Sequence, residues 1–139
     1  SDVYIRDRLE SDLLKIMAAC TEGTLADTEV KFSEGAACCV ILASGGYPVS
    51  YEKGKPISGL TNGQLEGESS ITVYHSGTAL REDGTLVTNG GRVLGVTATA
   101  PRLTAAITQA YAAAEKIRFE KLHKRTDIGM RALKAIAER

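Results

Sequence analysis

The sequence lacks the features that mark several large classes of protein. Basic and acidic side chains are equal in number, 17 of each, so there is no positive excess with which to hold a nucleic acid. No apolar run approaches the roughly 20 residues that a membrane-spanning helix needs. The first residues, Ser1 to Tyr4, carry neither the basic nor the apolar region of a secretory signal. We therefore expect no nucleic-acid partner, no membrane partner and a cytoplasmic location.

Cysteines are also few, and their spacing forms no pair. The three are Cys20, Cys38 and Cys39, with no C-x-x-C motif among them. Cys38 and Cys39 are adjacent in an apolar, strand-like run, so their side chains should point to opposite faces and should not bond to each other. We expect reduced, buried thiols, which agrees with a cytoplasmic location.

Motifs for catalysis and for nucleotide binding are missing as well. The chain contains no nucleophile elbow, no Walker loop and no dinucleotide fingerprint. His75 has no second histidine or carboxylate at metal-ligand spacing, and the only other histidine, His123, lies in a basic stretch. We predict a hydrogen-bonded, structural His75, no metal site and no catalytic residue. Nothing in these residues can bind ATP and magnesium unaided.

What is present suits one globular domain of helix, β region and helix. The length of 139 residues and the 43% of hydrophobic residues are ordinary for a folded domain. Ser11 is the predicted N-cap of a first helix that Gly23 ends. Residues 1–10 have a partial helical pattern of their own. We expect residues 1–10 to be the tail of a preceding domain and residues 11–139 to form the domain itself.

The middle of the chain predicts an antiparallel sheet. Ala36–Leu42 is a short apolar run typical of a buried strand, and Ile71–His75 is a second strand. Two turn signals follow, Asp83-Gly84 and Asn89-Gly90-Gly91, which predict a meander with tight hairpins. Helical periodicity returns from Leu103 to Ile117 and, more briefly, from Ile128 to Ile136. The sequence thus predicts an α+β fold, a mainly antiparallel sheet flanked by N- and C-terminal helices.

One turn has the chemistry of an anion site. Gly90 and Gly91 are able to present consecutive backbone N–H groups, and Arg92 beside them supplies a forked, permanent positive charge. Arg92 is in phase with Leu94 and Val96, so we predict that it points to the rim of the packed face. The alternative is a plain hairpin followed by a surface arginine.

A second glycine-rich segment ends the first strand. Ser44-Gly45-Gly46 leaves room for a ligand to approach the backbone, although an ordinary turn explains the same residues. Lys53 and Lys55 follow on a polar loop, where we expect solvated lysines.

Several blocks in order resemble a known family. They are Val40–Pro48, Tyr51–Ile57, Val73–Thr78, Val87–Leu94, Lys116–Phe119 and Arg125–Ala132. Together they cover the chain from about Leu9 to Leu133, and they are similar to the glycinamide ribonucleotide synthetases, which are ATP-grasp ligases. The resemblance identifies the C-terminal domain of such an enzyme.

The resemblance implies an activity for the whole enzyme. The family joins glycine to 5-phosphoribosylamine with ATP and Mg²⁺ (or Mn²⁺) in de novo purine biosynthesis, through a glycyl phosphate. ATP and metal bind to ATP-grasp segments outside this chain, so this part alone should be inactive. Its partners should be those missing segments and the small substrates phosphoribosylamine and glycine.

Residue roles follow from the same resemblance. Related ATP-grasp enzymes place a basic pair of this domain on the substrate phosphate, a role that falls here on Arg92, with Gly90 and Gly91 as backbone donors. Ser44, Gly45 and Gly46 should lie near the ribosylamine. Val49 replaces the glycine usual in the family, which changes the loop before Ser50.

Some questions stay open at this stage. The pattern assigns no role to Asp127 or Arg131 beyond a helix N-terminal aspartate and a salt-bridged arginine. The alternative function is a stand-alone, non-catalytic domain that binds a phosphorylated metabolite. The apolar residues among Ser1–Leu9 have no use in such a module and favour the ligase domain.

Overall fold

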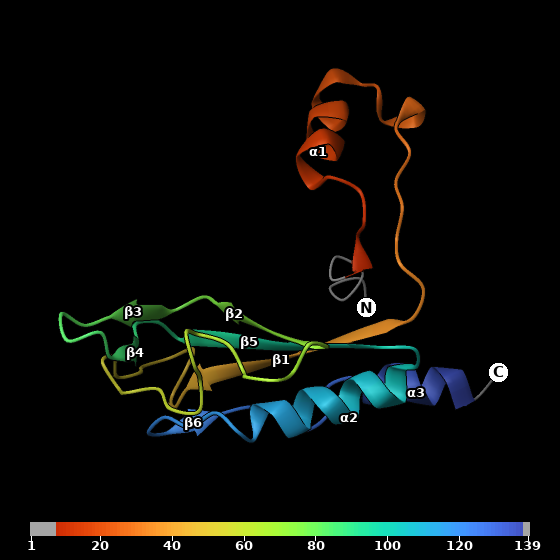
Figure 1. The fold of residues 1–139 in the computed structure, drawn as a ribbon. Helices are drawn as coiled ribbons and strands as arrows, with labels where there is room; N and C mark the ends of the chain where they lie inside the picture. The colour runs from red at the N-terminus through yellow and green to blue at the C-terminus, as the bar shows by residue number, and fades with distance from the viewer. Residues whose placement is uncertain (1–7, 138–139) are drawn as a thin grey trace.

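The computed structural model describes residues 8–137 and has two parts, a sheet with helices beneath it and an arm that rises from one end of the sheet (Figure 1). The predicted α+β class is confirmed, with a mainly antiparallel sheet and helices before and after it. In chain order the elements are α1 (Leu13–Glu22), the 3-10 turn η3 (Leu25–Asp27), β1 (Ala36–Ser44), β2 (Ile71–His75), β3 (Thr78–Leu80), β4 (Leu86–Thr88), β5 (Arg92–Ala100), α2 (Leu103–Ala114), β6 (Leu122–His123) and α3 (Met130–Ala137).

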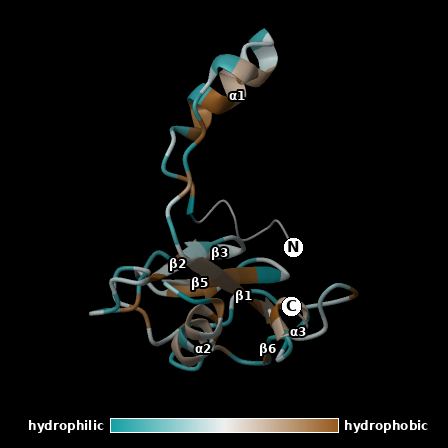
Figure 2. Ribbon diagram, turned by 90° about the vertical axis from the view of Figure 1, so that its right-hand side faces the viewer, coloured by the Kyte–Doolittle hydropathy of each residue, from teal (hydrophilic) through white to brown (hydrophobic). Residues whose placement is uncertain are grey.

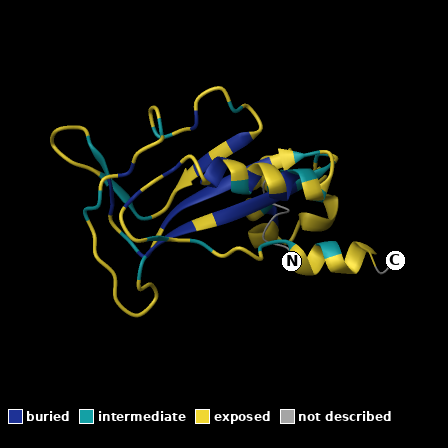
Figure 3. Cartoon of the chain, turned by 90° about the horizontal axis from the view of Figure 1, so that it is seen from below, coloured by how far each residue is buried: buried dark blue, intermediate teal, exposed yellow. Residues whose placement is uncertain are grey.

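The main sheet has four strands in the order β2-β5-β1-β6, and each neighbouring pair is antiparallel. The two long strands, β1 and β5, form its centre and pair from Ala36↔Ala100 to Ala43↔Arg92. Most of their residues are buried, as the apolar run of β1 predicts (Figure 3). These two strands therefore form the rigid part of the domain.

Helix α2 covers one face of this sheet. Its inward side is made of small residues such as Ala106 and Ala110, which are fully buried and let the helix lie close to the strands. Val40, Leu42 and Leu94 face it from the sheet and are also fully buried. Burying such side chains is the main source of folding free energy. Within residues 8–137, no helix packs on the opposite face, which is on the side toward which the arm rises (Figure 1).

Of the two predicted hairpins, the first is present and the second is not formed. Asp83-Gly84 turns between β3 and β4, with Gly84 at φ +81°, and the two strands make a separate two-stranded sheet. Asn89-Gly90-Gly91 instead leads the chain out of that ribbon into the main sheet, where β5 pairs with β1 and β2. The prediction of one continuous meander was wrong because the partners of β5 lie far away in the sequence.

The arm comprises residues 8–33, whose two legs are joined at the base. Glu10 N donates to Lys31 O (3.0 Å), and Ser33 N donates to Arg8 O (2.7 Å). The N-cap of α1 is Asp12, whose carboxylate accepts from Lys15 N at 3.0 Å, and not the predicted Ser11. Ser11 Oγ accepts from Lys31 N at 2.7 Å, so it holds the two legs together. Gly23 ends the helix in the left-handed conformation, as predicted.

The arm carries apolar side chains that the described structure leaves exposed. Leu14 is 75% exposed, and Leu13 and Met17 are more than half exposed. Figure 2 shows this hydrophobic stretch on α1, away from the sheet. Of the residues 1–10 predicted as a tail, residues 1–7 lie outside the described residues. Residues 8–10 pair with residues 31–33 and so belong to the base of the arm.

The cysteines are free, as predicted, but only two of them are shielded. Cys38 and Cys39 are buried in β1, and burial raises the pKa of the Cys38 thiol to about 11, with the neighbouring Cys39 adding to the rise. Cys20 is exposed on the arm, so the prediction that it is buried was wrong. Helical periodicity around it reflects an apolar face that the described part of the chain does not cover.

Near the C-terminus the predicted last helix is shorter than its periodicity indicated. Helix α3 begins at Met130, so Ile128 lies before the helix and not within it. Gly129 takes a left-handed φ of +82°, and a Cβ on it would lie 2.4 Å from the Ile107 side chain of α2. The chain therefore turns at Gly129 against α2 before the helix starts.

Candidate functional site

The turn between β4 and β5 lies against the end of β1. Ser44 N donates to Gly91 O, and Ser44 Oγ donates to Gly90 O, both at 2.8 Å. The fold therefore brings together two segments that are far apart in the sequence, Ser44–Gly46 and Gly90–Arg92. We call these six residues the strand-end corner. Every residue predicted to bind substrate belongs to it, and it lies at the opposite end of β1 from the arm.

Two consecutive amides in this corner have no partner in the protein. Among residues 8–137, the backbone N–H groups of Gly90 and Gly91 donate to no carbonyl or side chain. Their neighbours differ, since Asn89 N donates to Gly77 O at 2.7 Å. Adjacent unpaired amides next to a guanidinium are the donor set that binds oxyanions.

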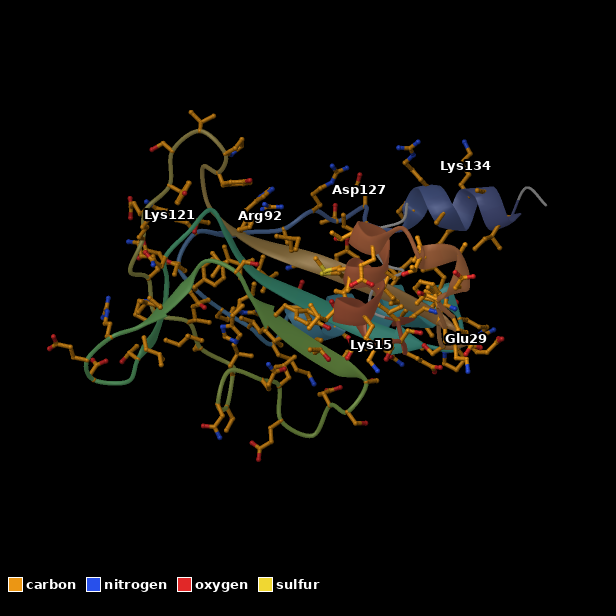
Figure 4. All side chains as sticks on the ribbon, turned by 90° about the horizontal axis from the view of Figure 1, so that it is seen from above. Lys15, Glu29, Arg92, Lys121, Asp127 and Lys134 are labelled. Carbon is orange, nitrogen blue, oxygen red and sulfur yellow. The ribbon has the colours of Figure 1, made fainter. Side chains whose placement is uncertain are left out.

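Arg92 is exposed at the first position of β5, but not on the face predicted from its phase. Leu94 pairs with Leu42, whereas Arg92 pairs with Ala43, because the register shifts by one residue between Leu42 and Ala43. Consecutive residues of a strand face opposite sides, so the bulge turns Arg92 to the open face, away from α2. The predicted phase with Leu94 and Val96 was wrong for this reason. Figure 4, which looks onto that open face, labels Arg92 at the end of the sheet with Lys121.

The Arg92 guanidinium has no carboxylate, and no other acceptor, among the described residues. A surface arginine usually finds a nearby carboxylate when one is in reach, and several basic residues close by do so. A permanent charge without an internal partner is available to a ligand.

The glycines of the corner are required by contacts within the protein. A Cβ on Gly45 would lie 2.7 Å from Lys121 O, and one on Gly46, at φ +89°, would lie 2.1 Å from Ser50 O. A Cβ on Gly91 would collide with the Tyr47 ring at 2.0 Å. The space we predicted for a ligand beside these glycines is thus taken up by neighbouring segments of the chain. Their amides, and not their missing side chains, are what a ligand is able to use.

Ser44 has a supporting position. Its side chain is buried, and its hydroxyl donates to the Gly90 carbonyl. The bond fixes the orientation of the Gly90–Gly91 peptide group, which also carries the Gly91 N–H. Ser44 therefore holds the turn in place from the end of β1.

The loop that follows the corner is fastened by ion pairs. Glu52 accepts from Lys121 at 2.8 Å and contacts Lys55 at 2.7 Å, while Lys55 also reaches Glu120 at 3.0 Å. Hydrogen bonds from Lys121 and then Lys55 lower the pKa of Glu52 to about 2, and the same pairing raises the pKa of Lys55. The expectation that Lys55 is merely solvated was wrong, since only 23% of its side chain is exposed. Lys53 is exposed, as expected.

His75 is hydrogen-bonded at both ring nitrogens, as predicted. Nδ1 lies 3.0 Å from Thr78 Oγ1, and Nε2 lies 2.9 Å from Gly63 O. Because a carbonyl only accepts, Nε2 must carry a proton. His75 thus ties the loop around Gly63 to the start of β3. It lines a cavity of about 830 Å³ whose other walls include Ile57, Asn62, Thr85 and Leu86.

The segment before α3 holds the remaining residues of interest. Arg125 binds both carboxylate oxygens of Asp127, at 2.8 and 2.6 Å, which lowers the pKa of Asp127. Tyr111 of α2 fastens this segment, since its hydroxyl donates to Arg125 O and accepts from Ile128 N. Asp127 precedes α3, in agreement with the structural role first considered for it, whereas Arg131 forms no ion pair within residues 8–137.

Two further searches of the described residues bear on cofactors and on membranes. Residues 8–137 contain no group of three or more His, Cys, Asp or Glu side chains placed to hold a metal ion. No helix in the same range is long and apolar enough to cross a bilayer.

Comparison with known proteins gives a consistent result. The chain is 44% identical over 126 residues to the phosphoribosylamine–glycine ligases of Synechocystis sp. and of Vibrio vulnificus. These matches cover 90% and 91% of this chain but only 29% and 28% of those proteins, so the chain spans about three tenths of the length of these relatives.

A solved structure agrees with the sequence matches. The crystal structure of phosphoribosylamine–glycine ligase from Thermotoga maritima superposes with a TM-score of 0.62 at 34% identity, over 80% of this chain and 27% of that one. Residues 37–131, more than half of the chain, match the family model described as phosphoribosylglycinamide synthetase, C domain. The chain therefore belongs to the phosphoribosylglycinamide synthetase C-domain family.

Proposed function

We propose that this chain is the C-terminal domain of a phosphoribosylamine–glycine ligase, and that its strand-end corner binds the phosphate of 5-phosphoribosylamine. The observation that carries the proposal is that the amides of Gly90 and Gly91 lie next to the guanidinium of Arg92 and that none of the three has a partner among residues 8–137. A phosphate monoester carries nearly two negative charges and three acceptor oxygens, which this donor set complements.

The phosphate lies far from the amine that reacts. Its binding energy therefore serves to hold the ribosylamine in position, which converts an encounter of two molecules into a reaction within one complex. Ser44 fixes the turn that presents the amides, and Gly45 and Gly46 set the path of the chain beside the ribose. In this proposal the domain contributes binding and orientation, and no catalytic residue.

The chemical step belongs to the rest of the ligase. In such a ligase, ATP with Mg²⁺ or Mn²⁺ would supply a phosphoryl group to the carboxylate of glycine and leave as ADP, and the amine of phosphoribosylamine would displace the phosphate to form the amide bond, in de novo purine biosynthesis. The described residues do not fit such a metal site, because they contain no cluster of three potential ligand side chains. We assign ATP, metal and glycine to ATP-grasp segments beyond residues 8–137, and we place the enzyme in the cytoplasm.

The arm favours the hypothesis that the chain is a domain of a larger enzyme over the hypothesis that it is a free-standing binding module. In the sequence, the apolar residues among Ser1–Leu9 favoured a ligase domain over a stand-alone module, but most of them lie outside the described residues. The exposed apolar side chains of α1 serve the same purpose, since Leu13, Leu14 and Met17 have no use in an isolated module. The arm rises on the side of the open face (Figure 1), so a body packed against both would cover that face, at whose far end Arg92 lies. The predicted boundary after residue 10 moves, because residues 8–10 pair with residues 31–33 of the arm, and we propose residues 11–139 together with these as the substrate-site domain.

The test uses the whole ligase with Arg92 changed. Arg92→Ala should reduce kcat/KM for phosphoribosylamine about ten- to a hundred-fold, because a charge-assisted hydrogen bond contributes roughly 1.5–3 kcal/mol. The Michaelis constants for ATP and glycine should stay the same. Arg92→Lys should recover part of the loss, since a point charge does not reproduce the fork.

Arg102 provides a matched control. It is an exposed arginine just beyond the other end of β5, and within residues 8–137 it also has no ion pair. Arg102→Ala should leave phosphoribosylamine kinetics unchanged. Equal losses in the two variants would mean that net charge, and not the corner, is responsible, and unchanged kinetics in Arg92→Ala would refute the proposed phosphate site.

A further inference from the structure

Arg92 and a second basic residue, His123, lie on either side of Ala43 in a row that crosses three neighbouring strands. Ala43 of β1 pairs with Arg92 of β5 on one side and with His123 of β6 on the other. Residues directly opposite each other in antiparallel strands point to the same face. Neighbouring strands lie about 4.8 Å apart, so the Cα atoms of Arg92 and His123 are about 10 Å apart with Ala43 between them.

The face on which this row lies follows from its neighbours. Ser44, next to Ala43, is buried and pairs with Leu122, which packs against the core under α2. Ala43 and His123 are therefore on the opposite, open face, where the bulge also puts Arg92. Both side chains at the ends of the row are exposed.

Charge pairing distinguishes His123 from the basic residues around it. Lys121 binds Glu52, Lys124 binds Glu115, and Arg125 binds Asp127. His123 lies in the middle of this run, yet its imidazole forms no ion pair or hydrogen bond with any described residue, and neither does the Arg92 guanidinium. Within residues 121–125, His123 is thus the basic residue whose side chain has no described partner, and it lies in the same row as Arg92.

Ala43 contributes only a methyl group to the space between them. No longer side chain of β1 lies between the guanidinium and the imidazole, and neighbouring segments leave Ala43 itself only 7% exposed. Two donors on either side of so small a residue are placed to bind different oxygens of one phosphate group. An imidazole N–H donates to an oxyanion whether the ring is neutral or charged.

We infer that His123 is a second phosphate-binding residue, which closes the corner from the side opposite Arg92. The inference rests on the proposed function, because it takes the phosphate monoester of the ribosylamine as the ligand. Sequence alone does not connect the two residues, since only the pairing of β6 with the end of β1 brings His123 to the corner.

The experiment measures binding of ribose 5-phosphate to this 139-residue chain by calorimetry at low salt, with ribose as the ligand that lacks the phosphate. His123→Ala and Arg92→Ala should each weaken ribose 5-phosphate binding, by about tenfold and by about ten- to a hundred-fold. His123→Lys should recover most of the loss. The double variant should lose less than the product of the single losses, because both groups hold the same phosphate.

Lys124→Ala is the matched control, since it removes a neighbouring positive charge that Glu115 already neutralises. It should change the affinity less than twofold. An equal loss in Lys124→Ala would show a general charge effect and would overturn the role of His123. Unchanged binding in His123→Ala beside a clear loss in Arg92→Ala would overturn this inference and leave the proposed function standing. If the wild-type chain shows no saturable binding, or if neither variant weakens it, both fail.

Discussion

The two faces of the four-stranded sheet differ in their side chains, which are apolar and buried on one face and include exposed basic groups on the other. Toward α2, Val40, Leu42 and Leu94 are completely buried and hold the domain together. On the other face, Arg92 at the start of β5 and His123 on the neighbouring β6 are exposed and have no ion pair within residues 8–137. A shift of one residue in the pairing of β1 with β5 separates the two roles. Register, and not position along the chain, therefore separates the side chains that stabilise the domain from those that we propose to bind phosphate.

The largest expected effect is a difference in the free energy of unfolding between substitutions on the two faces. Leu94→Ala should lower the free energy of unfolding by about 2–5 kcal/mol, because it leaves a cavity under α2. Arg92→Ala, two residues earlier, should change it by no more than about 0.5 kcal/mol, as is usual for an exposed side chain. Urea denaturation of both variants measures the difference. A loss in Arg92→Ala as large as that in Leu94→Ala would make Arg92 a structural residue.

A second comparison concerns two glycines with similar backbone angles. Gly46 and Gly67 have φ of +89° and +76°, but a Cβ on Gly46 would meet Ser50 O at 2.1 Å, whereas Gly67 has nothing within 4 Å. Gly67→Ala should cost about 1 kcal/mol for the left-handed conformation alone. Gly46→Ala should cost more than about 2 kcal/mol, since the loop must also move. Similar melting temperatures for both variants would show that the corner does not depend on this close contact.

Thiol labelling tests the difference between the arm and the two faces. Cys20 is exposed on the arm, Cys39 lies on the open face, and Cys38 faces the core with its pKa raised to about 11 by burial. Because the thiolate is the reactive form, native labelling should proceed in the order Cys20, then Cys39, then Cys38. Mass spectrometry of partly labelled protein gives this order. Reaction of Cys38 before Cys39 would mean that the face under α2 is the less protected one.

The smallest effect should come from the ion pairs beside the corner. Lys121 and Lys55 lower the pKa of Glu52 from 4.5 to about 2, so its contribution to stability is present above pH 4.5 and is lost as the pH falls toward 2. The difference in melting temperature between wild type and Glu52→Gln should therefore be small at pH 7 and should vanish near pH 2, since the pair is exposed. Glu66→Gln, in an exposed loop, is the control. A difference that persists at pH 2 would assign the effect to packing.

Local patterns in the sequence were sufficient for much of the fold. The apolar run from Ala36 to Leu42 predicted β1, and the periodicity after Leu103 predicted α2. Asp83-Gly84 correctly predicted the β3–β4 hairpin, because a tight turn depends on the residues at the turn itself. Each of these predictions needed only neighbouring residues.

Contacts between distant segments could not be predicted from these local patterns. No local pattern indicates that β5 pairs with β1 and β2, or that a bulge turns Arg92 to the open face. The burial of Lys55 by Glu52 and Glu120 depends on a loop that approaches the end of α2 from elsewhere in the chain. The residue types of the corner were predictable from chemistry, whereas their faces and partners follow from tertiary pairing.

The most direct test of the central claim is to locate where a phosphosugar binds. In amide NMR spectra of the chain, ribose 5-phosphate should shift the resonances of Gly90, Gly91 and Arg92 in a saturable manner, and ribose at equal concentration should not. The competing location is the cavity beside His75, whose walls include Asn62 and Thr85. Shifts concentrated on those cavity residues, with Gly90 to Arg92 unchanged, would contradict the claim that the strand-end corner is the phosphate site.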